Sequence, residues 1–122
     1  MTTPLHQVKA EFFKTLSHPV RIRVLELLSE REHSVGELLG RIEVEASNLS
    51  QQLAVLRRAG LVSTRKEGST VHYSLVSPQI AELMAVARSI LTSVLSERVD
   101  VLATLQNDAR SARGDQIRRG TR

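Results

Sequence analysis

The clearest pattern of hydrophobic and polar positions runs from Ser47 to Gly60. Leu49, Leu53 and Leu56 recur at intervals of four and three residues, so on a helix they form one apolar stripe. At about 100° per residue, the opposite side collects small polar, amide and arginine side chains without any acid. The pattern predicts an amphipathic helix whose outer face lacks the mixture of Glu and Lys typical of a solvated surface.

These outward side chains suit DNA, since Asn and Gln pair with adenine and Arg binds guanine or a phosphate. We therefore interpret the segment as a recognition helix that enters the major groove. From this segment alone, an ordinary amphipathic helix with an uncharged face is an equal alternative. The predicted contacts on this helix are Ser47, Asn48 and Gln51 for base edges, with Ser50 and Gln52 alongside, and Arg57 and Arg58 for phosphates.

Three shorter helices are predicted before it. The first starts after Thr3 with Pro4 in its first position, and the second is capped by Ser17 or His18 and ends near Ser29 or Glu30. A third runs from the capping box 34–37, S-V-G-E, to about residue 40. Ser47 is then the expected cap of the polar-faced helix. A short helix, a turn and a longer polar-faced helix are typical of a helix-turn-helix.

A basic hairpin follows the helix. Leu61–Arg65 and Thr70–Val76 alternate as strands do, and Lys66–Ser69 supplies a turn with a glycine. Arg65 and Lys66 place positive charge at its tip, where a wing would contact phosphates or the minor groove. His72 on the outer face of the second strand is predicted either to touch DNA or simply to be solvated.

A long helix is predicted from Pro78, with Ser77 as its cap, to about Leu105. It is about 29 residues, or roughly 43 Å, long. Its apolar stripe is too long for a small winged domain to cover, so a partner chain is expected to cover it. Arg98 interrupts the stripe, either where close packing stops or as a partner of an acid across an interface. The segment 107–122 has five arginines, two aspartates and few apolar residues, and is expected to be disordered.

Composition adds limits to this interpretation. The net charge of +4 and pI near 10.3 allow an anionic partner, although the tail and the winged segment carry most of the positive charge. The absence of cysteine excludes disulfides and thiolate metal sites. No apolar run approaches the roughly 18 residues that span a bilayer, and no signal peptide precedes the first helix, so a cytoplasmic protein is expected.

The predicted fold is mainly α with a small β-hairpin: a winged helix-turn-helix in the order helix, helix, helix, helix, strand, strand, helix. We expect residues 1–106 to form one DNA-binding and dimerisation domain and residues 107–122 a basic tail. No serine has a triad partner at a motif spacing, and neither a glycine-rich phosphate loop nor a paired-carboxylate motif occurs, so an enzyme is the least supported class.

Four ordered segments resemble the ArsR/SmtB family of bacterial winged-helix repressors. They are F-F-K-T-L-S-H-P-V-R-I-R-V-L-E-L-L at 12–28, S-V-G-E-L-L at 34–39, N-L-S-Q-Q-L-A-V-L-R-R-A-G-L-V at 48–62 and R-K-E-G-S-T-V-H-Y-S-L at 65–75. The resemblance covers roughly residues 5–105. It implies a homodimer joined by the first and last helices, an inverted-repeat operator and repression that a signal relieves. The interface residues would be Leu5, Val8, Phe12, Leu83, Met84, Ala87, Ile90, Leu91, Val94 and Leu95.

The sequence departs from the family at its sensing sites. Metal-sensing members often carry Cys-x-Cys at the third helix, where this chain has 35–39, V-G-E-L-L, or Asp and His on the last helix, where this chain has no histidine. We therefore predict no metal and no cofactor; a weak site around Glu30, Glu32 and His33 is the less favoured reading. The family's usual histidine before the central leucine is Gln52 here, which affects the expected base preference.

The favoured function is a dimeric, sequence-specific repressor that binds double-stranded DNA without a metal. Two alternatives stay open. The chain could be a winged-helix module whose last helix binds another protein, or a repressor that senses a small ligand between helices at the dimer interface.

Overall fold

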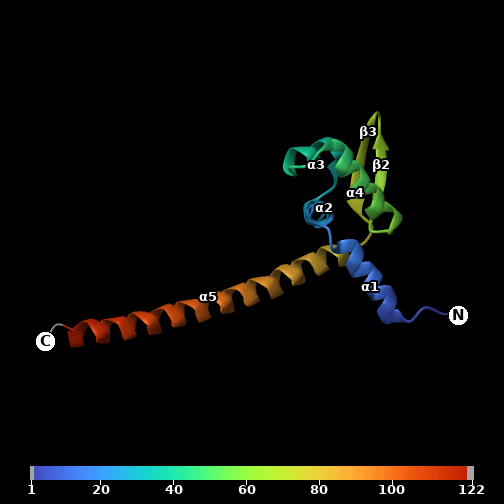
Figure 1. Cartoon of the computed structure of the whole chain (residues 1–122). Helices are drawn as coiled ribbons and strands as arrows, with labels where there is room; N and C mark the ends of the chain where they lie inside the picture. Colours follow the sequence, from blue (N-terminus) through green and yellow to red (C-terminus); the bar gives the residue numbers. More distant parts are fainter. Residues whose placement is uncertain (1, 121–122) are drawn as a thin grey trace. The chain divides into compact units, whose positions relative to one another are not determined.

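The computed structural model describes residues 2–120, with residues 111–120 as helical backbone alone. The chain forms two compact units, Met1–Ala85 and Val86–Arg122. The first unit holds four helices, a small sheet and the start of a fifth helix, and the second unit is the continuation of that helix (Figure 1). The mainly α winged helix-turn-helix is confirmed.

The first two helices are α1 (Leu5–Leu16) and α2 (Pro19–Glu30). Pro4 caps α1 instead of standing in its first turn, a shift of one residue from the prediction. His18 caps α2 as expected, because its Nδ1 accepts a hydrogen bond from the backbone N–H of Val20 at 3.2 Å. The inner face of α2 is buried and contributes much of the core, through Val24, Leu25, Leu27 and Leu28.

The capping box at Ser34 is confirmed and opens α3 (Val35–Arg41). The Ser34 hydroxyl accepts from the backbone N–H of Glu37, and the Glu37 carboxylate accepts from the backbone N–H of Ser34, both at 3.1 Å. Just before α3, the strand β1 (His33–Ser34) was missed by the sequence analysis. Two residues are too few to show alternation, and their pairing depends on a strand almost forty residues later.

The polar-faced helix is α4 (Ala46–Arg58), and its three leucines, Leu49, Leu53 and Leu56, are fully buried as predicted. Its start differs from the prediction. Glu45 is the cap residue and makes no side-chain capping bond, so Ser47 lies inside the first turn. Ala46, the best of helix formers, extends the helix by the residues that a serine cap would have excluded.

A glycine ends α4 as expected. Gly60 has φ +76°, its N–H donates to the carbonyl of Arg57, and the N–H of Leu61 donates to the carbonyl of Leu56, each at 3.0 Å. This is the Schellman arrangement, in which a left-handed residue lets the chain turn back over the last helical turn. The turn places Leu61 in the core and directs the chain into the hairpin.

The wing consists of β2 (Val62–Glu67) and β3 (Thr70–Leu75), which pair antiparallel from Val62 opposite Leu75 to Glu67 opposite Thr70. β1 pairs with the other side of β3, so the sheet order is β1-β3-β2 rather than a hairpin alone. The strands continue past the predicted turn and leave only Gly68 and Ser69 between them. Gly68 has φ +62°, which is a conformation that tight two-residue hairpin turns require and glycine adopts without strain.

The last helix, α5 (Pro78–Gly120), begins at the predicted cap, where Ser77 Oγ accepts from the backbone N–H of Gln79 at 3.2 Å. Its first turns bury Ile80 in the core of the first unit. The helix has 43 residues and ends well beyond the predicted end near Leu105. The stretch 107–120, expected to be disordered, is helical here, since no proline follows Pro78 to interrupt it. A domain boundary at residue 106 stays a prediction.

Among the described residues, no helix is both long enough and apolar enough to cross a membrane.

The capping box generates a test of acid stability. The backbone N–H of Ser34 and then the guanidinium of Arg31 lower the pKa of the Glu37 carboxyl from 4.5 to about 2. A group with a lowered pKa stabilises the fold above its unfolded value, and that contribution is lost as the pH falls from 4.5 toward 2. We expect Glu37→Gln to be less stable than the parent at pH 7 and to lose less stability between these two values.

Urea unfolding at a series of pH values from 7 to about 2 measures this. The matched control is Glu26→Gln, which also removes one helical carboxylate but only a 4.0 Å contact with Arg23. Parallel stability profiles for Glu37→Gln and the parent would contradict the prediction.

Candidate nucleic-acid interface

The predicted recognition surface is the outer face of α4. The linker 42–45 separates α3 from α4, giving the helix–turn–helix arrangement, and α4 packs against α2 and β2 (Figure 1). Burial of the leucine stripe leaves the opposite side in solvent. Five of the predicted contacts are exposed there: Ser47, Ser50, Gln51, Arg57 and Arg58. No acidic residue lies within α4, so nothing on the helix itself repels a phosphate.

Gln52 does not belong to this surface, which corrects its assignment as a DNA contact. Its side chain is 8% exposed and both ends of its amide are engaged inside the protein. Gln52 Oε1 accepts from Arg21 Nε at 2.8 Å, and Gln52 Nε2 donates to Asn48 Oδ1 at 2.9 Å. Asn48 itself is half-buried and lies between this contact and the exposed face.

Arg65 of the wing is exposed, but two carboxylates already hold it. Its guanidinium donates to both oxygens of Glu32, which precedes β1, and to Glu67 Oε2 at 3.1 Å. The hydrogen bonds that Arg65 donates to Glu32 and then to Glu67 raise the pKa of Arg65. The bond to Glu32 also lowers the pKa of Glu32. The predicted phosphate contact would therefore require Arg65 to exchange a carboxylate for a phosphate. Lys66 is exposed on the same strand.

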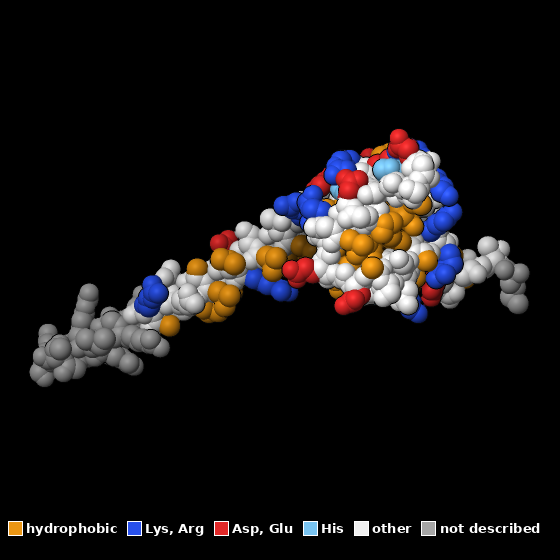
Figure 2. Space-filling model, turned by 90° about the horizontal axis from the view of Figure 1, so that it is seen from above, with side chains coloured by type: hydrophobic (Ala, Val, Ile, Leu, Met, Phe, Trp, Pro, Cys, Tyr) orange, Lys and Arg blue, Asp and Glu red, His pale blue; other side chains and the backbone are white. Residues whose placement is uncertain are grey.

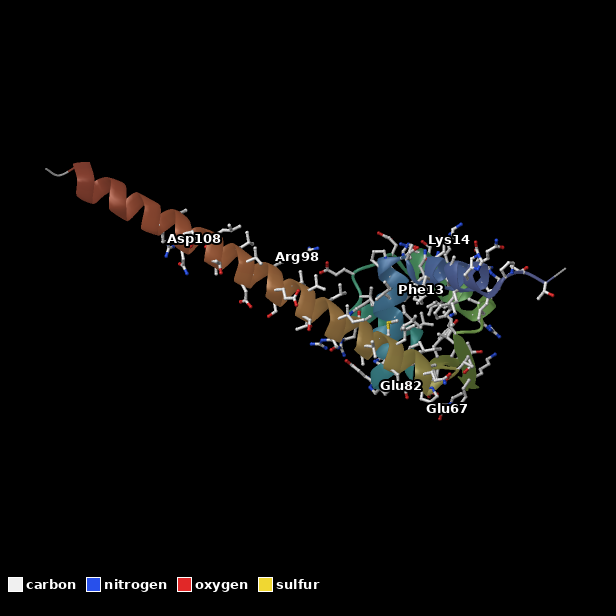
Figure 3. The ribbon with its side chains drawn as sticks, turned by 90° about the horizontal axis from the view of Figure 1, so that it is seen from below. Phe13, Lys14, Glu67, Glu82, Arg98 and Asp108 are labelled. Carbon is white, nitrogen blue, oxygen red and sulfur yellow. The ribbon has the colours of Figure 1, made fainter. Side chains whose placement is uncertain are left out.

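His72 on β3 lies between the same two carboxylates. Its Nδ1 is 3.7 Å from Glu32 Oε1 and its Nε2 is 3.6 Å from Glu67 Oε2. The side chain is only 19% exposed. His72 is thus close to the two carboxylates that bind Arg65. A contact between His72 and DNA stays a prediction. Glu67, the residue before the turn, is labelled in Figure 3.

The weak metal site considered around Glu30, Glu32 and His33 does not form. Glu32 is bonded to Arg65, and His33 is fully buried, with Nδ1 2.8 Å from the carbonyl oxygen of Arg31. Within the part of the chain that the structure describes, no three His, Cys, Asp or Glu side chains gather as a possible metal site.

The sequence analysis missed two residues that shape this surface. Arg21 was not singled out from the sequence; on α2 it donates to Gln52 and, at 3.0 Å, to the carbonyl of Thr15. Glu32 was considered only as a metal ligand, although it anchors the wing. Both contacts join residues more than thirty positions apart, so periodicity carries no signal for them.

The predicted dimer-interface residues fall into two groups. On the first unit, Leu5 and Val8 are exposed, whereas Phe12, Leu83 and Met84 already pack partly against the core. On the second unit, the described part of α5 exposes apolar side chains along its length (Figure 2). These include four predicted interface residues, Ile90, Leu91, Val94 and Leu95, with Ala87 half-buried. Arg98, labelled in Figure 3, is also exposed on this helix.

The helices, the acid-free outer face of α4 and the adjoining hairpin define a winged helix-turn-helix DNA-binding protein. A family of helix-turn-helix domains matches residues 16–65. The transcriptional regulator Rv0081 of Mycobacterium tuberculosis is 62% identical over 104 residues, which is 84% of this chain and 91% of that protein. Its crystal structure gives a TM-score of 0.74 over 80% of this chain and 99% of the other.

Two further proteins extend the comparison. The biofilm growth-associated repressor of Agrobacterium fabrum is 43% identical over 75 residues, 62% of this chain and 64% of the repressor. The homodimeric winged helix-turn-helix domain of Mb0332 from Mycobacterium bovis, a possible ArsR-family regulator, is 28% identical, with a TM-score of 0.67 over 76% of this chain and 85% of that domain. This chain belongs to the ArsR/SmtB family of winged helix-turn-helix transcriptional regulators.

Proposed function

We propose that this protein is a homodimeric, sequence-specific repressor that binds an inverted repeat, including one in its own promoter, and does not respond to metal ions. The observation that carries the proposal is the exposed face of α4, which combines amides, hydroxyls and arginines without an acid. Buried leucines on the opposite side fix this face outward. A relative named as a repressor supports the direction of regulation.

Roles follow from position on α4 and the wing. Residues near the start of a recognition helix lie closest to base edges, so Ser47, Asn48, Ser50 and Gln51 are assigned to bases. Arg57 and Arg58 in the last turn, with Arg65 and Lys66 on the wing, are assigned to phosphates. Gln52 is withdrawn from the set because its amide is committed inside the protein.

Fluorescence anisotropy on the promoter region tests both the function and these roles. Gln51→Ala should cost about 1–3 kcal/mol on the specific duplex and leave binding to a scrambled duplex nearly unchanged, because the amide contacts bases. Arg58→Ala, on the same helix, should weaken both duplexes alike and reduce the salt slope by about one unit per lost phosphate contact. Equal loss on both duplexes for Gln51→Ala would contradict base reading by that residue.

The same anisotropy titration tests whether DNA affinity depends on metal ions. One equivalent of Zn²⁺, Ni²⁺ or Cd²⁺ should leave the affinity unchanged, since no ligand set is present among the described residues. Release of the duplex by any of these ions would contradict the metal-independent assignment.

Equal affinity of the parent protein for promoter and scrambled duplexes would contradict the function and favour the alternative of a protein-interaction module.

Two variants of the wing contact between Glu32 and Arg65 should change DNA affinity in opposite directions. Glu32→Gln leaves Arg65 with one carboxylate fewer and removes a negative charge near the DNA. It should therefore raise affinity for specific and scrambled duplexes together and steepen the salt slope, whereas Arg65→Ala should lower affinity for both. Binding measured at several salt concentrations checks both. Unchanged binding by Arg65→Ala would instead assign Arg65 to holding the hairpin against the segment before β1.

The exposed apolar stripe on α5 supports dimerisation, as does the homodimeric state of the Mb0332 domain. Leu91 and Leu95 are 58% and 55% exposed in one chain, which a stable protein would bury against a partner. Leu91→Glu with Leu95→Glu should therefore give monomers in sedimentation velocity experiments at micromolar concentration. The control, Ser89→Glu with Ser93→Glu, adds the same charges to the opposite face and should leave the dimer intact. A monomeric parent protein would contradict the proposal.

A further inference from the structure

Hydrogen bonds with a fixed donor-to-acceptor direction connect α2 with α4 and extend toward its exposed face. Arg21 on α2 donates from Nε to Gln52 Oε1 at 2.8 Å, and Gln52 Nε2 donates to Asn48 Oδ1 at 2.9 Å. Asn48 and Gln52 are four residues apart on α4, so their side chains lie on the same side of the helix. The three side chains form one continuous chain of hydrogen bonds from the neighbouring helix to the start of α4.

The direction of this chain is set by Arg21, because a guanidinium has five N–H donors and no acceptor. Gln52 must therefore turn its oxygen toward Arg21, which leaves its NH₂ toward Asn48. Asn48 must in turn present its oxygen to that NH₂. The orientation of both amides follows from the chemistry of the arginine, whichever way each amide would turn by itself.

Arg21 and Gln52 are both held in place. A second nitrogen of Arg21 donates to the carbonyl of Thr15 at 3.0 Å, which fixes the guanidinium at the end of α1. Gln52 is only 8% exposed, so turning its amide over would leave a buried oxygen facing Asn48 and a buried NH₂ facing a guanidinium. In that orientation the NH₂ donors of Gln52 would face the donors of Arg21, and buried donors without acceptors lower the stability of the fold.

The outer end of the chain is the Nδ2 amide of Asn48. It has no hydrogen-bond partner among the residues that the structure describes, and the side chain is partly exposed near the start of α4. We propose that Arg21 and Gln52 fix Asn48 as a hydrogen-bond donor toward the major groove, so that Asn48 selects a base with acceptor atoms. Guanine, with O6 and N7, offers the best match.

This assignment excludes the pairing that asparagine makes most readily. A bidentate contact with adenine needs the amide oxygen turned to N6–H and the amide nitrogen turned to N7. Here the oxygen is turned toward the buried Gln52, and only the nitrogen remains for the base. Arg21 and Gln52 are positioning residues in this proposal: they touch no DNA, but they determine which base Asn48 selects. The inference rests on the proposed DNA-binding function.

The decisive variant is Gln52→Glu. The introduced carboxylate still accepts from Arg21, so the contact between the helices is retained as an ion pair. A carboxylate has no donor, however, and Asn48 must turn its NH₂ inward and its oxygen outward. The preference at that base pair should change from guanine to a base with a donor in the major groove, cytosine or adenine, by on the order of tenfold.

The experiment is selection of duplexes from a randomised library by the full-length parent and by each variant, with sequencing of the bound fraction. Asn48→Ala should lose the preference at one base pair in each half-site and keep the rest of the motif. Gln52→Glu should reverse it, and in an Asn48→Ala background Gln52→Glu should change nothing further at that pair. This double variant separates the turned amide from a simple effect of added negative charge.

Arg21→Met keeps the inference testable if Gln52→Glu does not fold, which thermal unfolding will show. Without the guanidinium, both amides are free to turn, and the preference at that pair should fall toward equality while the rest of the motif persists. An unchanged motif for Asn48→Ala, or for Gln52→Glu and Arg21→Met in folded form, would overturn the inference. A parent protein that selects no motif would instead overturn the proposed function, on which the inference depends.

Discussion

The burial of Leu49, Leu53 and Leu56 is the constraint on which the rest of the structure depends. These three side chains fix the rotation of α4 about its own axis, because any other rotation would expose them and bury polar groups. Everything exposed on the helix follows from that orientation. At the end of the helix, the backbone carbonyl of Leu56 accepts from the N–H of Leu61 as the chain turns at Gly60, and Leu61 enters the core. Burial of the leucines thus orients the outer face of α4, and the glycine turn that follows leads into the wing.

Local sequence rules were sufficient at three helix ends, although not at the start of α4, where Ser47 is not the cap. The capping box at Ser34, the His18 cap and the glycine end of α4 were all predictable, because each bond joins residues at most five positions apart. The strand β1 and the anchoring of Arg65 by Glu32 were not, since their partners lie about thirty to forty residues away. The extent of α5 was misjudged for another reason. Its apolar stripe weakens after Leu105, but the helical backbone needs no stripe to continue.

Gln52 shows why the DNA face itself was only partly predictable. A glutamine within an acid-free polar helix is a reasonable base contact, and periodicity places it between the buried and exposed sides. Inside the protein its amide oxygen is bonded by Arg21, a residue of another helix. The two side chains bond each other there, and further bonds from Arg21 to the Thr15 carbonyl and from Gln52 to Asn48 also offset the cost of burying them. The burial of Gln52 could therefore not be predicted from its own segment.

The arginines that we propose for phosphate binding have different surroundings on α4 and on the wing. On α4 the arginines stand free of acids, so their charge is available to phosphates without any rearrangement. On the wing, Glu32 and Glu67 both bind Arg65, so its guanidinium reaches a phosphate only by exchanging a carboxylate contact. Because the non-specific part of affinity comes from neutralised phosphates, the proposal implies that the pairing of Arg65 with carboxylates limits binding to random DNA. Under the same proposal, discrimination between sequences depends on α4, where hydrogen bonds from Arg21 through Gln52 reach Asn48.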